Sequence, residues 1–115
     1  SHTAFAPKYE VYKEDGATVG QQYPTDSGPI DILAISKDKK TLLVIELKRG
    51  RASDVVVGQV LRYMGYVKEE LAEVGQDVKG AIIALEEDPK LRLALKMLPF
   101  IDFFQYQVSF KLEKV

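Results

Sequence analysis

The pattern of apolar and polar positions divides the chain into strand-like and helix-like segments. Two runs rich in β-branched and apolar residues, joined by a charged turn, predict strands over Ile30–Ser36 and Thr41–Lys48. Apolar residues at helical spacing then predict a long helix that follows Ser53 as its N-cap and ends near Val74. The residues expected to form the buried stripe of this helix are Val56, Val60, Tyr63, Val67, Leu71 and Val74.

Shorter elements are expected on both sides of this hairpin and helix. Downstream, the pattern predicts a strand over Gly80–Leu85, a helix over Asp88–Leu98 and a final strand over Phe100–Leu112. Upstream, two short strands are expected, over Lys8–Lys13 and Val19–Tyr23. This order predicts an α/β domain with a mixed β-sheet. The hairpin is apolar on both faces, so we expect it at the centre of the sheet, with helices packed on both faces.

Each strand of the predicted hairpin nevertheless carries an acidic residue, Asp31 or Glu46. If the turn is centred between Asp38 and Lys39, an antiparallel pairing places Asp31 directly opposite Glu46. A bulged turn would shift this register by one residue. Side chains on a strand repeat every second position, so Lys48 is expected on the same face as Glu46.

Two carboxylates that face each other inside a covered sheet destabilise it unless their charge is offset. Like charges directly opposite repel, and partial burial makes each ionised carboxylate more costly. A divalent cation such as Mg²⁺, which prefers oxygen ligands, removes this cost. The alternative is purely structural, with Lys48 neutralising Glu46 while Asp31 is solvated at the start of its strand. The spacing favours the metal site.

Composition narrows the available chemistry. The chain has 115 residues, enough for one domain, with no Cys and one His. Thiolate chemistry, a histidine-rich zinc site and a Ser-His-Asp triad are therefore excluded. The net charge of −1 argues against wholesale electrostatic binding to nucleic acid, and no apolar run is long enough to cross a membrane.

The first residues of the sequence suggest that it was cut from a longer protein. Ser1 and His2 resemble the remnant of a tag, and the chain does not begin with Met. We expect residues 1–115 to form a single domain of a longer protein that has additional domains. The absence of Cys fits a reducing compartment, which predicts a cytoplasmic location.

The run from Gly28 to about Val67 resembles the PD-(D/E)XK nuclease superfamily. An Asp at a strand start, Asp31, is followed on the next strand by Glu-x-Lys in "IELK". In "GQVLRYMGYV", Gln59 and Tyr63 match the QxxxY helix signature of the RecB-like branch. The whole run is similar to the catalytic domain of NucS-type endonucleases. The resemblance implies a restriction-endonuclease-like fold and a Mg²⁺-dependent DNA endonuclease of repair or restriction, associated with the nucleoid.

The resemblance also implies roles for individual residues. The implied ligands of one or two Mg²⁺ ions, for which Mn²⁺ can substitute, are Asp31, Glu46 and the backbone carbonyl of Leu47. Lys48 would hold the attacking water or offset charge. Gln59 and Tyr63, four residues apart on one helix face, would orient the site and contact nucleic acid. Without the resemblance, a rim Gln and a half-buried core Tyr are the simpler interpretation.

Basic residues after the second hairpin strand are candidate contacts to DNA. Arg49 and Arg51 can each grip a phosphate through two hydrogen bonds, and Arg62 is a further candidate. A solvated basic edge is the alternative interpretation. Gly58 and Gly65 lie seven residues apart on the outer helix face, which leaves open either close packing in a homodimer or ordinary tolerance of glycine.

One feature of the resembling family has no clear equivalent in this sequence. The family usually has an upstream helix whose Glu joins the metal site, whereas Glu10 and Glu14 lie in a strand-like context. The competing hypothesis is therefore a nuclease-fold module that binds nucleic acid without cutting it, or serves assembly within a larger protein. In both hypotheses the expected partner is DNA, and its single-stranded, branched or duplex form stays open.

Overall fold

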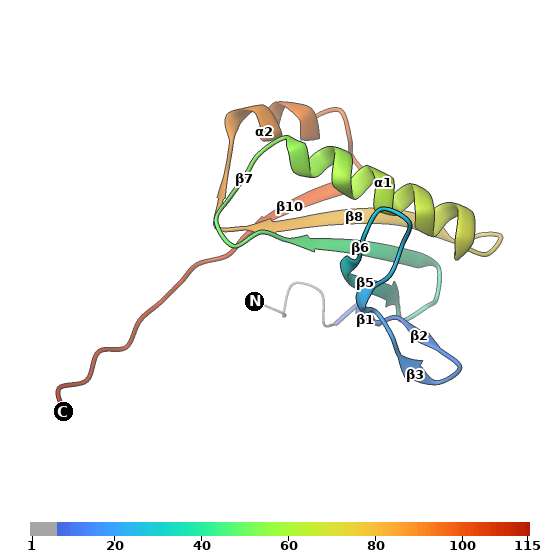
Figure 1. The fold of residues 1–115 in the computed structure, drawn as a ribbon, viewed down its shortest axis with the longest axis horizontal. Coiled ribbons are helices and arrows are strands. Elements are labelled where there is room, and N and C mark those ends of the chain that lie inside the picture. Colours follow the sequence, from blue (N-terminus) through green and yellow to red (C-terminus); the bar gives the residue numbers. More distant parts are fainter. Residues whose placement is uncertain (1–6) are drawn as a thin grey trace.

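The computed structural model describes residues 7–115, and its centre is one mixed β-sheet (Figure 1). The strands of this sheet are β1 (Tyr9–Val11), β4 (Gln21–Tyr23), β5 (Ile30–Ser36), β6 (Thr41–Leu47), β8 (Asp77–Ala84) and β10 (Ile101–Gln105). Their order is β1-β5-β6-β8-β10, with β4 also paired to β5. The antiparallel hairpin β5–β6 is central, as predicted, and β8 and β10 extend the sheet in parallel.

Two small ribbons and two helices complete the fold. β2 (Lys13–Glu14) pairs with β3 (Ala17–Thr18), and β7 (Arg51–Ala52) pairs with β9 (Glu86–Glu87). The helices are α1 (Val55–Glu70) and α2 (Pro89–Leu95). Within residues 7–115, neither helix is long and apolar enough to cross a membrane. The expected tag remnant, residues 1 and 2, lies outside the described residues.

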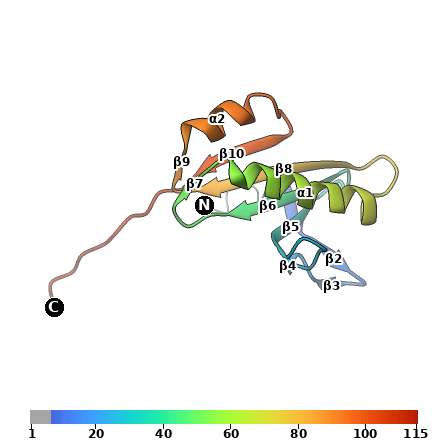
Figure 2. The ribbon, with the colours of Figure 1, turned by 45° about the horizontal axis from the view of Figure 1, so that its top comes forward.

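Both helices pack on the same face of the sheet (Figures 1 and 2). The larger core joins α1 and α2 to that face through residues that include Val60, Val67, Leu91, Leu33, Val44 and Ile82. The opposite face carries a small cluster of Ala34, Leu43, Ile45 and Ala81, and no helix within residues 7–115 covers it. The prediction of helices on both faces is therefore wrong for the described chain.

The connections between strands explain why the helices share a face. α1 links the parallel strands β6 and β8, and α2 links the parallel strands β8 and β10. Crossovers between parallel strands are right-handed in nearly all proteins. The strand order β6-β8-β10 advances in one direction across the sheet, so two crossovers of the same hand place both helices on one side.

The long helix is shorter than the sequence pattern predicts. It begins at Val55 after Asp54 and ends at Glu70, where the N–H groups of Leu71 and Ala72 both donate to the carbonyl of Val67. Val56, Val60, Tyr63 and Val67 are buried as expected, and Leu71 packs partly against the core. Val74 is fully exposed, so the prediction that it belongs to the buried stripe is wrong.

The downstream elements also differ from prediction at their ends. β8 begins at Asp77 instead of Gly80, because its first residues pair with the start of β6. α2 ends at Leu95 instead of Leu98, and Asp88 caps it by accepting a hydrogen bond from the N–H of Lys90 (2.7 Å). The last strand ends at Gln105 instead of Leu112, and residues 106–115 form no regular element.

Gly20 lies where the upstream chain passes against β5, and its substitution should be strongly destabilising. Its carbonyl accepts a hydrogen bond from the N–H of Leu33 (2.7 Å). A Cβ at Gly20 would overlap the carbonyl oxygen of Leu33 and lie 2.8 Å from the backbone nitrogen of Tyr12. Backbone atoms cannot rotate away, so Gly20→Ala should lower the free energy of unfolding by about 3 kcal/mol in urea titrations.

Gly65 provides the matched control for this prediction. It lies in the exposed part of α1, and a Cβ there would meet no atom within 4 Å. Gly65→Ala should raise the free energy of unfolding by up to about 1 kcal/mol, because Ala is the better helix former. Equal urea midpoints for Gly20→Ala and the unsubstituted chain would contradict the close approach at Gly20.

Candidate active site

The register of the β5–β6 hairpin agrees with the sequence prediction. Ile32 pairs with Ile45, and the following pairs continue in the same register to Ile35 and Leu42. One step in the other direction places Asp31 opposite Glu46. Asp31 Oδ2 accepts a hydrogen bond from the N–H of Leu47 (2.9 Å), which fixes the carboxylate beside Glu46.

A second donor holds the Asp31 carboxylate from the upstream part of the chain. Gln22 Nε2 lies 3.3 Å from Asp31 Oδ1 and donates a hydrogen bond to it. Gln22 has a φ of 51°, in the left-handed region that most side chains avoid. No sequence signal points to Gln22, because it lies nine residues before Asp31 in a segment with no motif. β4 pairs with β5 through Gln21 with Ile32 and Tyr23 with Ile30, which places Gln22 across from Asp31.

Glu46 is the one charged residue within residues 7–115 that is buried, with 3% of its surface exposed. Its Oε2 lies 3.7 Å from Lys48 Nζ, whereas its Oε1 is buried without a hydrogen-bond partner. The pKa of the Glu46 carboxyl is raised to about 7, first by burial and then by the adjacent Asp31 carboxyl, against the opposing effect of Lys48. This buried acid therefore lacks sufficient neutralising charge from the protein.

A chain of hydrogen bonds connects Glu46 to helix α1. Lys48 Nζ donates to Gln59 Oε1 (3.0 Å), and Gln59 Nε2 donates to Tyr63 Oη (3.2 Å). Tyr63 is buried, with 3% of its surface exposed, so its hydroxyl is a fixed anchor for the amide of Gln59. The structure thus brings together Asp31, Glu46, Lys48, Gln59 and Tyr63, the residues that the sequence predicted to act as one site.

Asp31 lines a shallow depression at the end of β6, and Glu46 is buried beside it. The depression has a volume of about 400 Å³ and is lined by Gln22, Asp31, Leu47, Lys48, Arg49 and Tyr106. The hydroxyl of Tyr106 donates a hydrogen bond to the carbonyl of Arg49, which ties the end of β10 to the loop after β6. Tyr106 was also missed as a site residue, because its partner lies 57 residues earlier and no local pattern links them.

The other two predicted DNA contacts do not line this depression. Arg51 lies in β7, where its Nη2 is 3.8 Å from Asp88 Oδ2 at the start of α2. Arg62 is exposed on α1, and its guanidinium lies over Gly58, one helical turn earlier. Of the three arginines, the structure brings only Arg49 to the predicted site.

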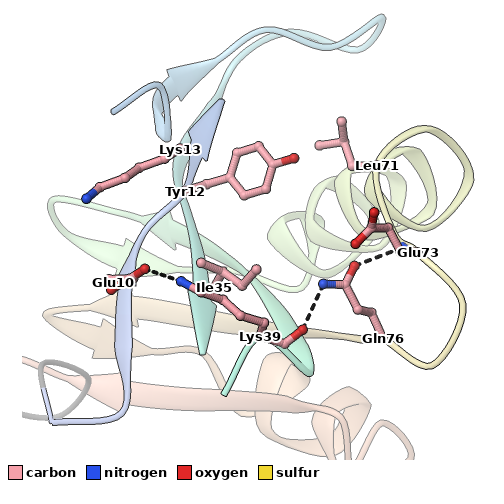
Figure 3. A pocket seen from close by; sticks show the side chains of 8 residues that line it. All are labelled: Glu10, Tyr12, Lys13, Ile35, Lys39, Leu71, Glu73 and Gln76. Carbon is pink, nitrogen blue, oxygen red and sulfur yellow. Dashed lines mark hydrogen bonds and ion pairs between the residues drawn. The ribbon is translucent and has the colours of Figure 1, made fainter. Parts of the chain in front are cut away.

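The upstream acids lie elsewhere. Glu14 accepts a hydrogen bond from the hydroxyl of Tyr23 (3.3 Å). Glu10 forms an ion pair with Lys39 beside the hairpin turn, and this contact lowers the pKa of the Glu10 carboxyl (Figure 3). Gln76 closes the same hollow, where its Nε2 donates to the carbonyl of Lys39 (2.8 Å). Neither Glu10 nor Glu14 therefore supplies a third carboxylate beside Asp31.

The donor set at the hairpin fits a hard divalent cation. Between residues 7 and 115 no cluster of three or more His, Cys, Asp or Glu side chains is formed, so the protein offers two carboxylates. Mg²⁺ commonly binds through one or two carboxylates and keeps several waters. The unpartnered Oε1 of Glu46 and the raised pKa of its carboxyl are what a site for such a cation would show without it.

Comparison with protein families gives a match over most of the chain. Residues 7–98 match the family model described as the endonuclease NucS C-terminal domain. A protein named endonuclease NucS from Pyrococcus abyssi is 33% identical over 92 residues, which cover 78% of this chain and 35% of that protein. Its namesake from Sulfolobus acidocaldarius is 37% identical over 67 residues, which cover 57% of this chain and 24% of that protein. The chain thus spans about a third or less of these relatives.

Two solved structures superimpose on most of the chain. The crystal structure of a repair endonuclease from Pyrococcus abyssi superimposes with a TM-score of 0.67 at 24% identity, covering 87% of this chain and 39% of that one. A structure described as an EndoMS–dsDNA complex superimposes with a TM-score of 0.68 at 20% identity, covering 91% of this chain and 39% of that one. At these identities the likeness establishes the fold.

Proposed function

Because the chain belongs to the family of endonuclease NucS C-terminal domains, we propose that it is a Mg²⁺-dependent DNA endonuclease domain of the PD-(D/E)XK type. The proposal includes a restriction-endonuclease-like fold and a role in DNA repair. The observation that carries it is the buried Glu46 carboxylate, which faces Asp31 and has one oxygen without a partner. The names of the relatives support the proposal, as does the neighbour whose structure is described as a complex with double-stranded DNA.

Two side chains and one backbone group would hold the cation. Asp31 and Glu46 supply carboxylate oxygens, and the carbonyl of Leu47 follows directly on the same strand. Mn²⁺ prefers similar oxygen ligands and should substitute. When bound, the cation would supply Lewis acidity, which activates water and stabilises the negative charge that develops on phosphate during hydrolysis.

The neighbouring residues position the remaining groups of the reaction. Lys48 Nζ is held between Glu46 Oε2 and Gln59 Oε1, where it can orient the attacking water or offset charge on phosphate. Gln59 is fixed in turn by the buried hydroxyl of Tyr63. We propose that Gln59 and Tyr63 are positioning residues that act through Lys48. Arg49, at the edge of the depression, is the proposed phosphate contact.

One observation favours a second function, a module that binds DNA without cutting it. The described residues place two acids at the site, and the upstream Glu residues are engaged elsewhere. Because the chain spans about a third or less of its relatives, we also propose that it is one domain of a longer parent protein. If catalysis requires a third acid, a part of that parent outside residues 7–115 has to provide it. Isolated, the chain would then bind DNA through Arg49 and the depression but would not cleave it.

A cleavage assay separates these two functions. The 115-residue chain and its longer parent protein are incubated with plasmid, single-stranded and branched DNA, in Mg²⁺, in Mn²⁺ and in EDTA. We expect the parent to cut in both metals and not in EDTA, and Asp31→Asn to lower its rate by at least about 10²-fold. Absence of cleavage by the parent would refute the enzymatic proposal. Metal-independent binding that Arg49→Ala removes and Arg62→Ala retains would then support the binding module.

A further inference from the structure

Strand β10 forms one edge of the sheet and leaves half of its backbone groups unpaired within residues 7–115. It pairs with β8 on one side, and no strand of the described chain lies on its other side. The N–H of Tyr106 donates to Ala84, and the carbonyl of Phe100 accepts from Gly80. The backbone N–H and C=O groups of the even-numbered residues therefore point toward β8. By alternation, the N–H and C=O groups of residues 103 and 105 point to the open edge.

The sequence after β10 continues the pattern of a strand. Apolar side chains recur at every second position through Tyr106, Val108, Phe110 and Leu112, with polar residues between them. Phe104 packs on the sheet face without helices, so these residues continue that face. Val108, Phe110 and Leu112 are 58%, 86% and 93% exposed, and the segment runs away from the body of the domain (Figures 1 and 2). An alternating strand pattern with no neighbouring strand is typical of a segment that pairs with another chain.

We propose that residues 106–115, called the C-terminal arm, pair with β10 and the arm of a second copy of this chain. The two arms would run antiparallel about a twofold axis at Val108. Each arm would then cover the open edge of the other copy's β10, and the two sheets would become one continuous sheet. Twofold symmetry is the commonest symmetry of protein oligomers.

The sequence of the arm selects this register over its neighbours. With Val108 opposite its own copy, Tyr106 faces Phe110, and Phe104 faces Leu112. The same register places Asp102 opposite Lys114, which pairs opposite charges across the strands. It also pairs odd-numbered with odd-numbered residues, whose backbone groups point to the open edge. A shift of two residues in one direction places Phe104 opposite Lys114, and in the other direction it places Asp102 opposite Leu112.

Disulfide trapping tests both the pairing and its register, because the chain contains no Cys. In the proposed ribbon, the two copies of residue 108 form a non-hydrogen-bonded pair with Cα atoms ~4.5 Å apart, close enough for a disulfide. Residue 111 faces residue 105, so its two copies lie about 20 Å apart. We expect Val108→Cys to form a covalent dimer under mild oxidation at least ten times faster than Lys111→Cys.

Analytical ultracentrifugation of the full 115-residue chain gives the second measurement. We expect a concentration-dependent dimer, which is lost when residues 107–115 are deleted or when Phe110→Lys is introduced. Ser109→Lys, on the polar face of the arm, should retain the dimer. Equal trapping rates at positions 108 and 111 would indicate an unpaired arm and overturn the proposal. A monomer at all concentrations, or a dimer that survives the deletion, would overturn it as well.

Discussion

Replacing Glu46 by Gln is expected to reduce Mg²⁺-dependent cleavage by the parent protein by about 10³-fold or more, which corresponds to roughly 4 kcal/mol of transition-state stabilisation. Gln has nearly the same shape as Glu, so the side chain should still fit its buried position beside β8. It carries no charge, however, and its amide NH₂ group repels a cation. The change therefore removes the proposed ligand while the packing around it is retained.

A matched control and a folding measurement make this result specific. Glu73→Gln changes the same atoms at an exposed position in the hollow beside the hairpin turn, and it should leave the cleavage rate within about twofold. Circular dichroism should show both variants to be folded. If Glu46→Gln cleaves DNA at the rate of the Glu73→Gln control, Glu46 is not a metal ligand and the proposed site is wrong.

The register at the centre of this site could be predicted because it depends on local sequence. The hairpin turn is closed by contacts among neighbours, in which Asp38 accepts hydrogen bonds from Ser36 Oγ (2.6 Å) and from the N–H of Lys40 (3.0 Å). Lys39 adopts a φ of 65° in the turn. Since these groups lie within five residues of one another, the strand pattern and the turn together determine which residues face each other.

The covering of the sheet could not be predicted from the same pattern. Leu33 and Ala34 are both buried, on opposite faces of β5. The sequence of β5 is therefore apolar on both faces, whether or not a helix covers them. Which face receives a helix depends on the hand of the crossovers and on the strand order, and neither is encoded in residue alternation. The exposed Val74 shows the same limit, because helical spacing does not indicate where a helix ends.

The site residues that were missed depend on contacts between distant segments. Gln22 reaches Asp31 only after β4 pairs with β5, and Tyr106 reaches Arg49 only after β10 completes the sheet. Arg51 shows the converse case. Its position after the second hairpin strand suggested a phosphate contact, but β7 places its guanidinium near Asp88. A motif thus identifies groups fixed within one hairpin and helix, whereas the walls of the site are set by the tertiary fold.

The raised pKa of Glu46 should make the free energy of unfolding depend on pH. Its pKa is raised from 4.5 to about 7, by burial first and then by the neighbouring Asp31 carboxyl. Between these values the folded protein keeps a proton that the unfolded chain has released. The free energy of unfolding should therefore fall as the pH rises from about 4.5 to about 7, by roughly 3 kcal/mol in total from this group.

The difference between the unsubstituted chain and Glu46→Gln isolates this contribution, because all other titrating groups are shared. In urea titrations from pH 4.5 to pH 8, Glu46→Gln should gain stability relative to the unsubstituted chain as the pH rises. Mg²⁺ binds the ionised carboxylates, so it should stabilise the unsubstituted chain at pH 8 and have little effect near pH 4.5 or on Glu46→Gln. A stability difference that does not vary with pH would show that Glu46 has an ordinary acidity, and with it the electrostatic basis for a cation at this hairpin would be lost.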